Sequence, residues 1–295
     1  MIYRLLRPEF ELKKLLVFLV VYSLLSLNAC MESPSGTKEA IIENEPVYID
    51  STEGKSNVYK NYHLPLPVEA CKMLKNKNIS YNKTYLLERR IKEKYQTEEK
   101  KSLIIGVYST DLVYNIVYNK NQEVIEYFSV TSDMANKLEI TDGYSKKLID
   151  KAANYIDNND SLNKYAREAY WRTCSFLEKN NKSNILPLII LGSWTESMYY
   201  LMEALKTEAN VNDLTPEIYT QKENLQNLAL YFKEITATEQ IDVYKETLKK
   251  WSDKLNYLQL EFENIKPSKN KQPGLNEFSK VINAIEQLRA EIISE

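Results

Sequence analysis

Glycine is scarce in this chain, and that scarcity limits what the chain can fold into. Only six of the 295 residues are glycine, and four of those follow residue 66. A β-domain of this size would need more glycine in its turns. Apolar side chains instead recur every three or four residues, which is the spacing of one helix face. The sequence therefore predicts an all-α fold, a multi-helix bundle of about 8–10 helices.

The helices are expected from residue 67 onward, where the apolar spacing becomes regular. Their predicted ranges are 67–77, 83–96, 100–119, 121–139, 143–157, 161–180, 184–207, 216–237, 240–265 and 275–293. The start at 216 depends on Thr215-Pro216-Glu217, a capping hydroxyl before a proline. A polar linker, 266–274, separates the last two helices, which we expect to pair as a C-terminal hairpin.

The apolar positions between Tyr244 and Phe262 alternate by four and three, as in a heptad seam. The pattern covers fewer than three full repeats. We expect the seam to pack within its own bundle. The alternative is a coiled coil with a protein partner at the C-terminal helices.

The N-terminus carries the pattern of a bacterial lipoprotein signal peptide. Four basic residues precede an apolar run, Leu15–Leu27, which ends just before Ala29 and Cys30. A membrane-spanning helix needs about 20 apolar residues, so this run is short for one and typical of a cleaved signal. We predict that residues 1–29 are the signal peptide and that Cys30 is the lipidated residue.

The rest of the chain then divides into a tether and a domain. Residues 30–45 are polar and predict a flexible tether, followed by a helical domain over 46–295 with a sub-boundary near 209–214. A lipidated Cys30 would anchor the protein to a membrane. We expect the protein to lie in the cell envelope, anchored at the outer membrane. Loss of the signal removes four of 39 basic and two of 41 acidic residues, so the net charge moves from −2 to −4. That balance argues against nucleic acid as a partner.

Several kinds of chemistry lack the residues they need. His63 is the one histidine, so a His-rich metal site cannot form. A Ser-His-Asp triad would have to use His63, which lies outside the predicted core. Glycine-rich phosphate loops are absent as well. We therefore predict no metal site and no cofactor. Cys71 and Cys174 lie on apolar faces and are expected to be free buried thiols, with a disulfide between them as the alternative.

Two predicted helices are apolar on nearly every side and carry one acid each. Asp111 interrupts Leu103–Tyr118, and Glu196 interrupts Ile185–Met202. An unpaired buried carboxylate is costly. Each acid therefore needs a partner, such as a tyrosine hydroxyl, a tryptophan N–H, an arginine or a ligand. Arg167 and Arg172 are candidate arginines.

Two interpretations of these acids stay open. In the first they belong to an internal polar network that fixes helix packing. In the second they belong to a ligand pocket lined by Tyr108, Asp111, Tyr114, Trp194 and Glu196. Gly106 and Gly192 would let two backbones, or a ligand, come close.

Three functions follow from these alternatives. We expect a binding or scaffolding role, and the sequence supplies no molecular activity. The runner-up is an enzyme that acts on envelope glycans or peptides through Asp111 and Glu196, and a third class is a ligand sensor. If the acids are packing elements, Asp111→Asn and Glu196→Gln should both lower the melting temperature.

Three blocks of the chain resemble those of a known family. They are Leu64–Glu69, Gly106–Leu112 and Leu191–Glu196, and the resemblance spans roughly residues 60–210. The family is an uncharacterised group of exported helical lipoproteins from Bacteroidetes. The resemblance implies an envelope location and a helical fold, and it supplies no activity. Ser109 stands where the family usually has Gly or Ala, and Ser193 where it often has Gly.

Overall fold

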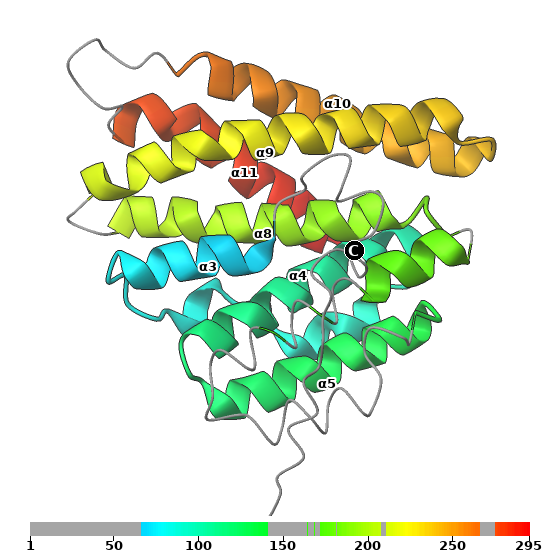
Figure 1. The fold of residues 1–295 in the computed structure, drawn as a ribbon, viewed down its shortest axis with the longest axis horizontal. Helices are drawn as coiled ribbons and strands as arrows, with labels where there is room; N and C mark the ends of the chain where they lie inside the picture. The colour runs from blue at the N-terminus through cyan, green and yellow to red at the C-terminus, as the bar shows by residue number, and fades with distance from the viewer. Residues whose placement is uncertain are drawn as a thin grey trace, which may run out of the picture. The chain divides into compact units, whose positions relative to one another are not determined.

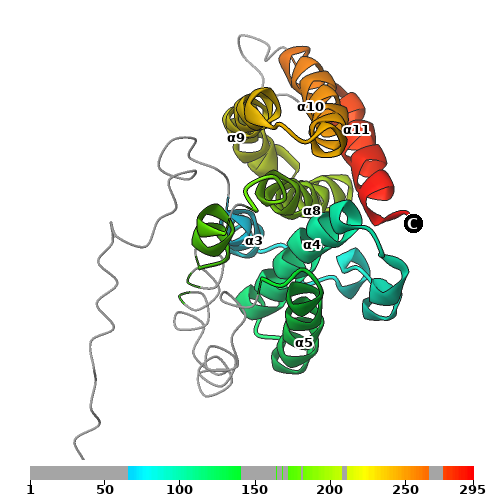
Figure 2. The same cartoon turned by 90° about the vertical axis from the view of Figure 1, so that its right-hand side faces the viewer.

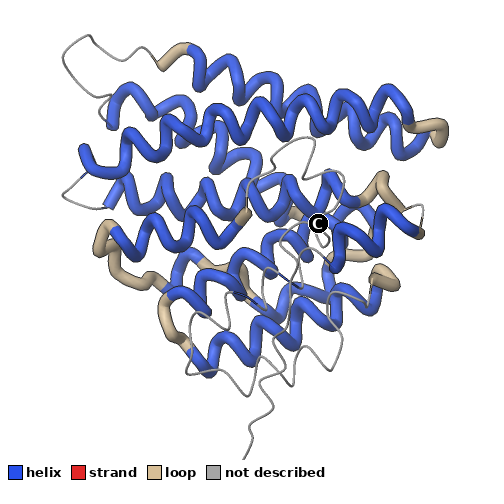
Figure 3. The backbone as a smooth tube through the Cα atoms, in the orientation of Figure 1, coloured by secondary structure: helices blue, strands red, loops and turns tan. Residues whose placement is uncertain are grey.

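The computed structural model describes residues 66–140, 172–180, 182–207, 211–265 and 275–295, and the isolated residues 164 and 168. These residues all belong to one compact unit, Ile49–Glu295. All of their regular secondary structure is helical (Figure 3). The predicted signal peptide, Cys30, the tether, His63 and the predicted helix 143–157 lie outside the described residues.

The helices confirm the all-α bundle. The long ones, labelled in Figure 1, are α3 (Pro67–Asn76), α4 (Glu98–Val117), α5 (Asn121–Lys137), α8 (Leu186–Thr207), α9 (Val211–Thr238), α10 (Asp242–Glu263) and α11 (Leu275–Ile293). Two short 3₁₀ turns, Lys83–Tyr85 and Arg89–Lys94, precede α4. None of the helices in the described part of the chain is both long and apolar enough to cross a membrane.

Three helices end without glycine, which shows how a glycine-poor chain makes its turns. Just beyond the ends of α3, α4 and α5, residues Asn78, Asn119 and Glu139 have φ values of 58°, 56° and 57°. After α3, the backbone N–H groups of Asn78 and Ile79 reach back to carbonyls of the last helical turn. This is a Schellman arrangement. Asparagine tolerates the left-handed conformation better than most residues, so it replaces glycine at two of the three ends.

The centre of the bundle is the contact between α4 and α8. A Cβ atom added to Gly106 would lie 2.1 Å from the carbonyl oxygen of Ile189. A Cβ atom added to Gly192 would lie 2.0 Å from the carbonyl oxygen of Leu103. The two glycines therefore let the helix backbones touch, which is the first of the two roles that the sequence suggested for them.

The C-terminal helices pack together and against α8. Figure 2 shows α9, α10 and α11 grouped on one side of α8, with α4 and α5 on the other. α10 and α11 run in opposite directions and contact each other, as expected of a hairpin, although α10 packs more extensively on α9. The heptad seam of α10 is buried from Leu248 to Phe262. In this structure the seam therefore packs within its own bundle.

Two of the predicted helices differ from the structure, one in type and one in its start. The range 83–96 contains two 3₁₀ turns rather than one α-helix. Side chains from other helices bind the backbone of this range, and these bonds outweigh its helix propensity. α9 begins at Val211, so Pro216 lies inside the helix instead of at its start. Leu214 and Thr215 are fully buried, so packing against the bundle stabilises helix ahead of Pro216.

Candidate functional site

Asp111 of α4 and Glu196 of α8 meet in the interior of the bundle. Each lies about one turn beyond the glycine of its helix, so the close approach of the two backbones brings the acids together. Both side chains are 0% exposed. Burial raises the pKa of Glu196, and Arg289 and the neighbouring Asp111 offset part of that rise. Glu196 in turn raises the pKa of Asp111, so the two carboxyl groups interact directly. The two acids therefore form one pair.

Arg289 of α11 supplies the positive charge. Its Nε lies 2.6 Å from Oε2 of Glu196, and its Nη2 lies 2.8 Å from Oε1. Nη2 also donates to the carbonyl oxygen of Tyr85 at 3.1 Å. The guanidinium stacks 3.9 Å from the ring centroid of Tyr199. This two-bond geometry between arginine and carboxylate is the strong form of the ion pair.

The sequence did not single out Arg289, and its candidate Arg172 was wrong. Arg172 lies at the surface and pairs with Glu168 on its own helix at 2.6 Å. The side chain of Arg167 lies outside the described residues. A signal for Arg289 does exist in the sequence. It stands four residues after Ile285 and three before Ile292, so it is a lone cation on the apolar face of α11.

Asp111 is satisfied by neutral groups. The hydroxyl of Tyr200 donates to its Oδ1, and the backbone N–H of Leu87 donates to its Oδ2 at 3.2 Å. Within the described parts of the chain, Asp111 takes part in no ion pair. Burial raises the pKa of Asp111 well above its usual range, and the neighbouring Glu196 raises it further.

A stretch without α-helix, residues 79–95, covers this cluster, and tyrosine hydroxyls bind its backbone. We call it the tyrosine-bound segment. Tyr118 donates to the carbonyl of Ile79, Tyr127 to that of Leu87 and Tyr108 to that of Glu88, at 2.8, 2.8 and 3.0 Å. Tyr114 accepts from the N–H of Asn82 at 2.9 Å. Buried backbone groups need such partners when no helix supplies them. Part of the chain's large tyrosine content therefore serves this segment.

The structure brings together most, but not all, of the five predicted pocket residues. The ring of Tyr114 lies 4.7 Å from that of Tyr200, which binds Asp111. Tyr108 holds the segment above the pair through Glu88. Trp194 does not join them, since two helical residues span about 200° and place it on the other side of α8 from Glu196. Its Nε1 is buried and has no hydrogen-bond partner in the described structure.

The arrangement is a closed polar network rather than an open cleft. Tyr108, Asp111, Tyr114 and Glu196 have no exposed surface, and Trp194 is 2% exposed. No group of three His, Cys, Asp or Glu residues in the described ranges could hold a metal ion. Catalysis by a carboxylate pair would need room for substrate and water between the acids, whereas Arg289 and Tyr200 occupy their free sides.

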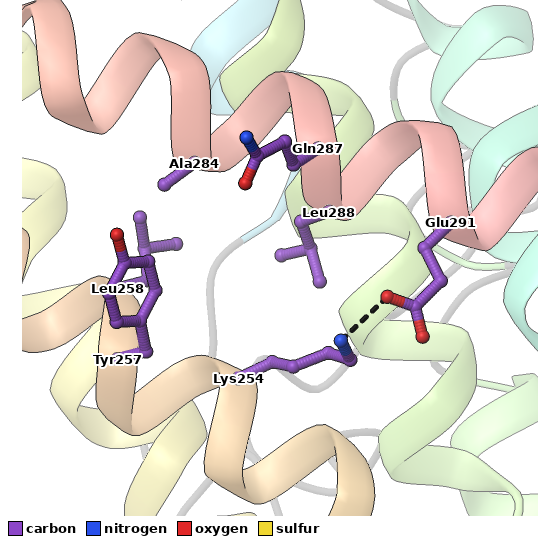
Figure 4. Close-up of a pocket in the computed structure, with 7 residues that line it drawn as sticks. All are labelled: Lys254, Tyr257, Leu258, Ala284, Gln287, Leu288 and Glu291. Carbon is purple, nitrogen blue, oxygen red and sulfur yellow. Dashed lines mark ion pairs between the residues drawn. The ribbon is translucent and has the colours of Figure 1, made fainter.

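A second feature is a small cleft between α10 and α11 (Figure 4). Its volume is about 130 Å³, and Leu258, Ala284 and Leu288 contribute its apolar wall. The two charges at its edge, Lys254 and Glu291, pair with each other at 2.6 Å. The cleft therefore offers shape and apolar surface but no uncompensated charge for a ligand.

Comparisons with protein-family models, curated proteins and solved structures found no match to this chain. The function must therefore be argued from the residues described above. The resemblance to exported lipoproteins of Bacteroidetes stays a prediction from the sequence.

Proposed function

We propose that this chain is a lipid-anchored protein of the bacterial cell envelope, at the outer membrane, and that its helical domain binds or scaffolds a partner. The anchor is argued from the basic, apolar and Ala29-Cys30 pattern of the N-terminus. The preference for binding or scaffolding over catalysis by Asp111 and Glu196 rests on one observation. Both acids have no exposed surface, and groups of the protein itself occupy their oxygens.

The alternatives need access that this geometry does not offer. An enzyme working through Asp111 and Glu196 would have to open α4, α8 and α11, because Arg289 occupies both oxygens of Glu196. A ligand sensor using the same residues would meet the same obstacle. A partner surface on the C-terminal helices has more support, since Tyr257 and Leu260 of α10 are 54% and 58% exposed.

The anchor is tested by substitution at one residue. We expect Cys30→Ser to abolish incorporation of radiolabelled fatty acid and to leave an uncut or soluble chain, because only a cysteine at this position can be lipidated. Cys71→Ala is the matched control and should label like the parent. Labelling of the Cys30→Ser chain at the parent level would contradict the anchor.

The binding or scaffolding role is tested on the full chain purified from its native host. Native mass spectrometry should then show the mass of the lipidated protein without a retained small molecule. A stoichiometric small molecule that is lost on Glu196→Gln substitution would instead support the sensor or the enzyme.

A further inference from the structure

The cluster around Asp111 contains more carboxyl groups than cations. Asp111 and Glu196 are two acids, and Arg289 is the cation that pairs with Glu196 and lowers the pKa of Asp111 electrostatically. The other titratable groups facing the pair are Tyr199 and Tyr200 from α8, Tyr108 from α4, Cys71 from α3, Tyr127 from α5, and Tyr81 and Tyr95 from the tyrosine-bound segment. Tyrosines and buried thiols are uncharged at neutral pH. If both acids were ionised, the site would carry one uncompensated negative charge.

We infer that the folded chain holds one proton on the Asp111–Glu196 pair at neutral pH and that this proton is located on Asp111. The stability of the packing between α4, α8 and α11 then depends on pH. An uncompensated charge at a site with no exposed surface is strongly unfavourable. One proton makes the cluster neutral. The inference is independent of the proposed anchor and partner.

The hydrogen bonds assign the proton to Asp111 rather than to Glu196. Both oxygens of Glu196 accept from Arg289, at 2.6 and 2.8 Å, which requires the ionised form for full strength. The partners of Asp111 on both oxygens are neutral donors, and an uncharged carboxylic acid can still accept from both. Because the ionised Glu196 acts on Asp111 electrostatically, a proton on Asp111 removes the repulsion between the two acids.

The direction of the pH effect follows from where the proton is bound. In the unfolded chain an aspartate has a pKa of about 3.9 and is ionised at neutral pH. The pKa of Asp111 in the folded chain is raised by burial. The folded state therefore binds one more proton than the unfolded state, and stability is lost as pH rises. This loss extends from just above the unfolded pKa up to the raised folded pKa.

The test compares the full chain with its Asp111→Asn variant. Asparagine keeps a donor and an acceptor at this position but cannot lose a proton. The equilibrium constant for unfolding should rise with pH about tenfold more per unit in the parent than in Asp111→Asn, which corresponds to one proton. Asp133→Asn, at the half-exposed Asp133 of α5, is the matched control and should keep the slope of the parent. Equal slopes for the parent and Asp111→Asn would overturn the inference.

A second measurement does not depend on the variant folding. The infrared spectrum of the native parent at neutral pH should contain the C=O stretch of a protonated carboxylic acid, and the band should disappear on unfolding. In a folded Asp111→Asn variant the band should be absent. A parent spectrum without the band, or a band retained in Asp111→Asn, would overturn the assignment.

Discussion

At the scale of single residues, Glu196 and Arg289 differ from the other ion pairs of the protein in their burial. Lys206–Glu286 and Lys254–Glu291 join helices at the surface, with both partners about a third exposed. Exposed pairs of this kind contribute about 0–1 kcal/mol. In the Arg289–Glu196 pair, 12% of the arginine side chain and none of the glutamate is exposed. Breaking it leaves a charge inside the bundle.

Glu196→Gln should therefore destabilise the protein by about 3–5 kcal/mol, because Arg289 loses its counter-charge in the interior. Asp111→Asn should cost much less at neutral pH, since asparagine resembles a protonated Asp111. Both substitutions are still expected to lower the melting temperature, as the sequence suggested, but by different amounts. Urea unfolding measures both. Glu286→Gln is the surface control, with an expected change below about 1 kcal/mol. Equal losses at positions 111 and 196 would contradict the asymmetry.

At the scale of elements, the contact between α4 and α8 depends on the absence of a side chain at Gly106 and at Gly192. The space that a Cβ would need at Gly192 is occupied by the backbone of Leu103. Backbone of a buried helix cannot move aside as the end of a flexible side chain can. The same close approach brings Asp111 and Glu196 near enough to raise the pKa of Asp111, so the packing of these helices and the polar cluster depend on each other.

Gly192→Ala is expected to destabilise the protein by about 1–3 kcal/mol through overpacking. At an unhindered helix position the same change would stabilise by about 1 kcal/mol, so the sign of the effect is diagnostic. Thermal or urea unfolding measures it. Ser279→Ala, at an exposed position of α11, should stay within about 0.5 kcal/mol of the parent. A gain in stability for Gly192→Ala would be incompatible with the contact described.

At the scale of the whole molecule, α11 connects parts of the bundle that are far apart in sequence. It contacts α8, α10 and α4. Its last turn accepts hydrogen bonds from Lys100 at Glu291 and from Tyr95 at Ile293, at 2.6 and 2.9 Å. The helix therefore fastens the tyrosine-bound segment and the start of α4 to the C-terminal helices.

The two buried cysteines report on the opening of this bundle. Cys71 and Cys174 form no disulfide in the described structure and are buried, as expected, and burial raises the pKa of the Cys71 thiol. We predict that a thiol reagent labels neither cysteine in the native mature chain. Both should react in denaturant, with a midpoint that matches unfolding. Rapid labelling of either cysteine under native conditions would contradict this prediction, because it would show that the helices around that cysteine open locally.

The sequence alone determined the features that depend on spacing along one element. The three-and-four spacing placed α4, α5, α8, α10 and α11 to within a few residues, because a buried helix face must be apolar. The same argument predicted that Asp111 and Glu196 are buried and need partners. The sequence also marked Gly106 and Gly192 as positions where two backbones, or a ligand, could come close; the structure shows that backbones do so.

Only the tertiary structure decided which residues satisfy those needs. Arg289 lies 93 residues from Glu196 in sequence. Its place on the apolar face of α11 indicates burial, but only the packing of α11 on α8 makes Glu196 its partner. The range 83–96 carries helix-forming residues, but tyrosine hydroxyls from α4 and α5 and the carboxyl of Asp111 bind the backbone at its centre instead. Trp194 shares an apolar helix with Glu196 yet lies on its opposite side. In each case the deciding contact joins distant parts of the chain, so its free energy becomes available only once the helices have packed.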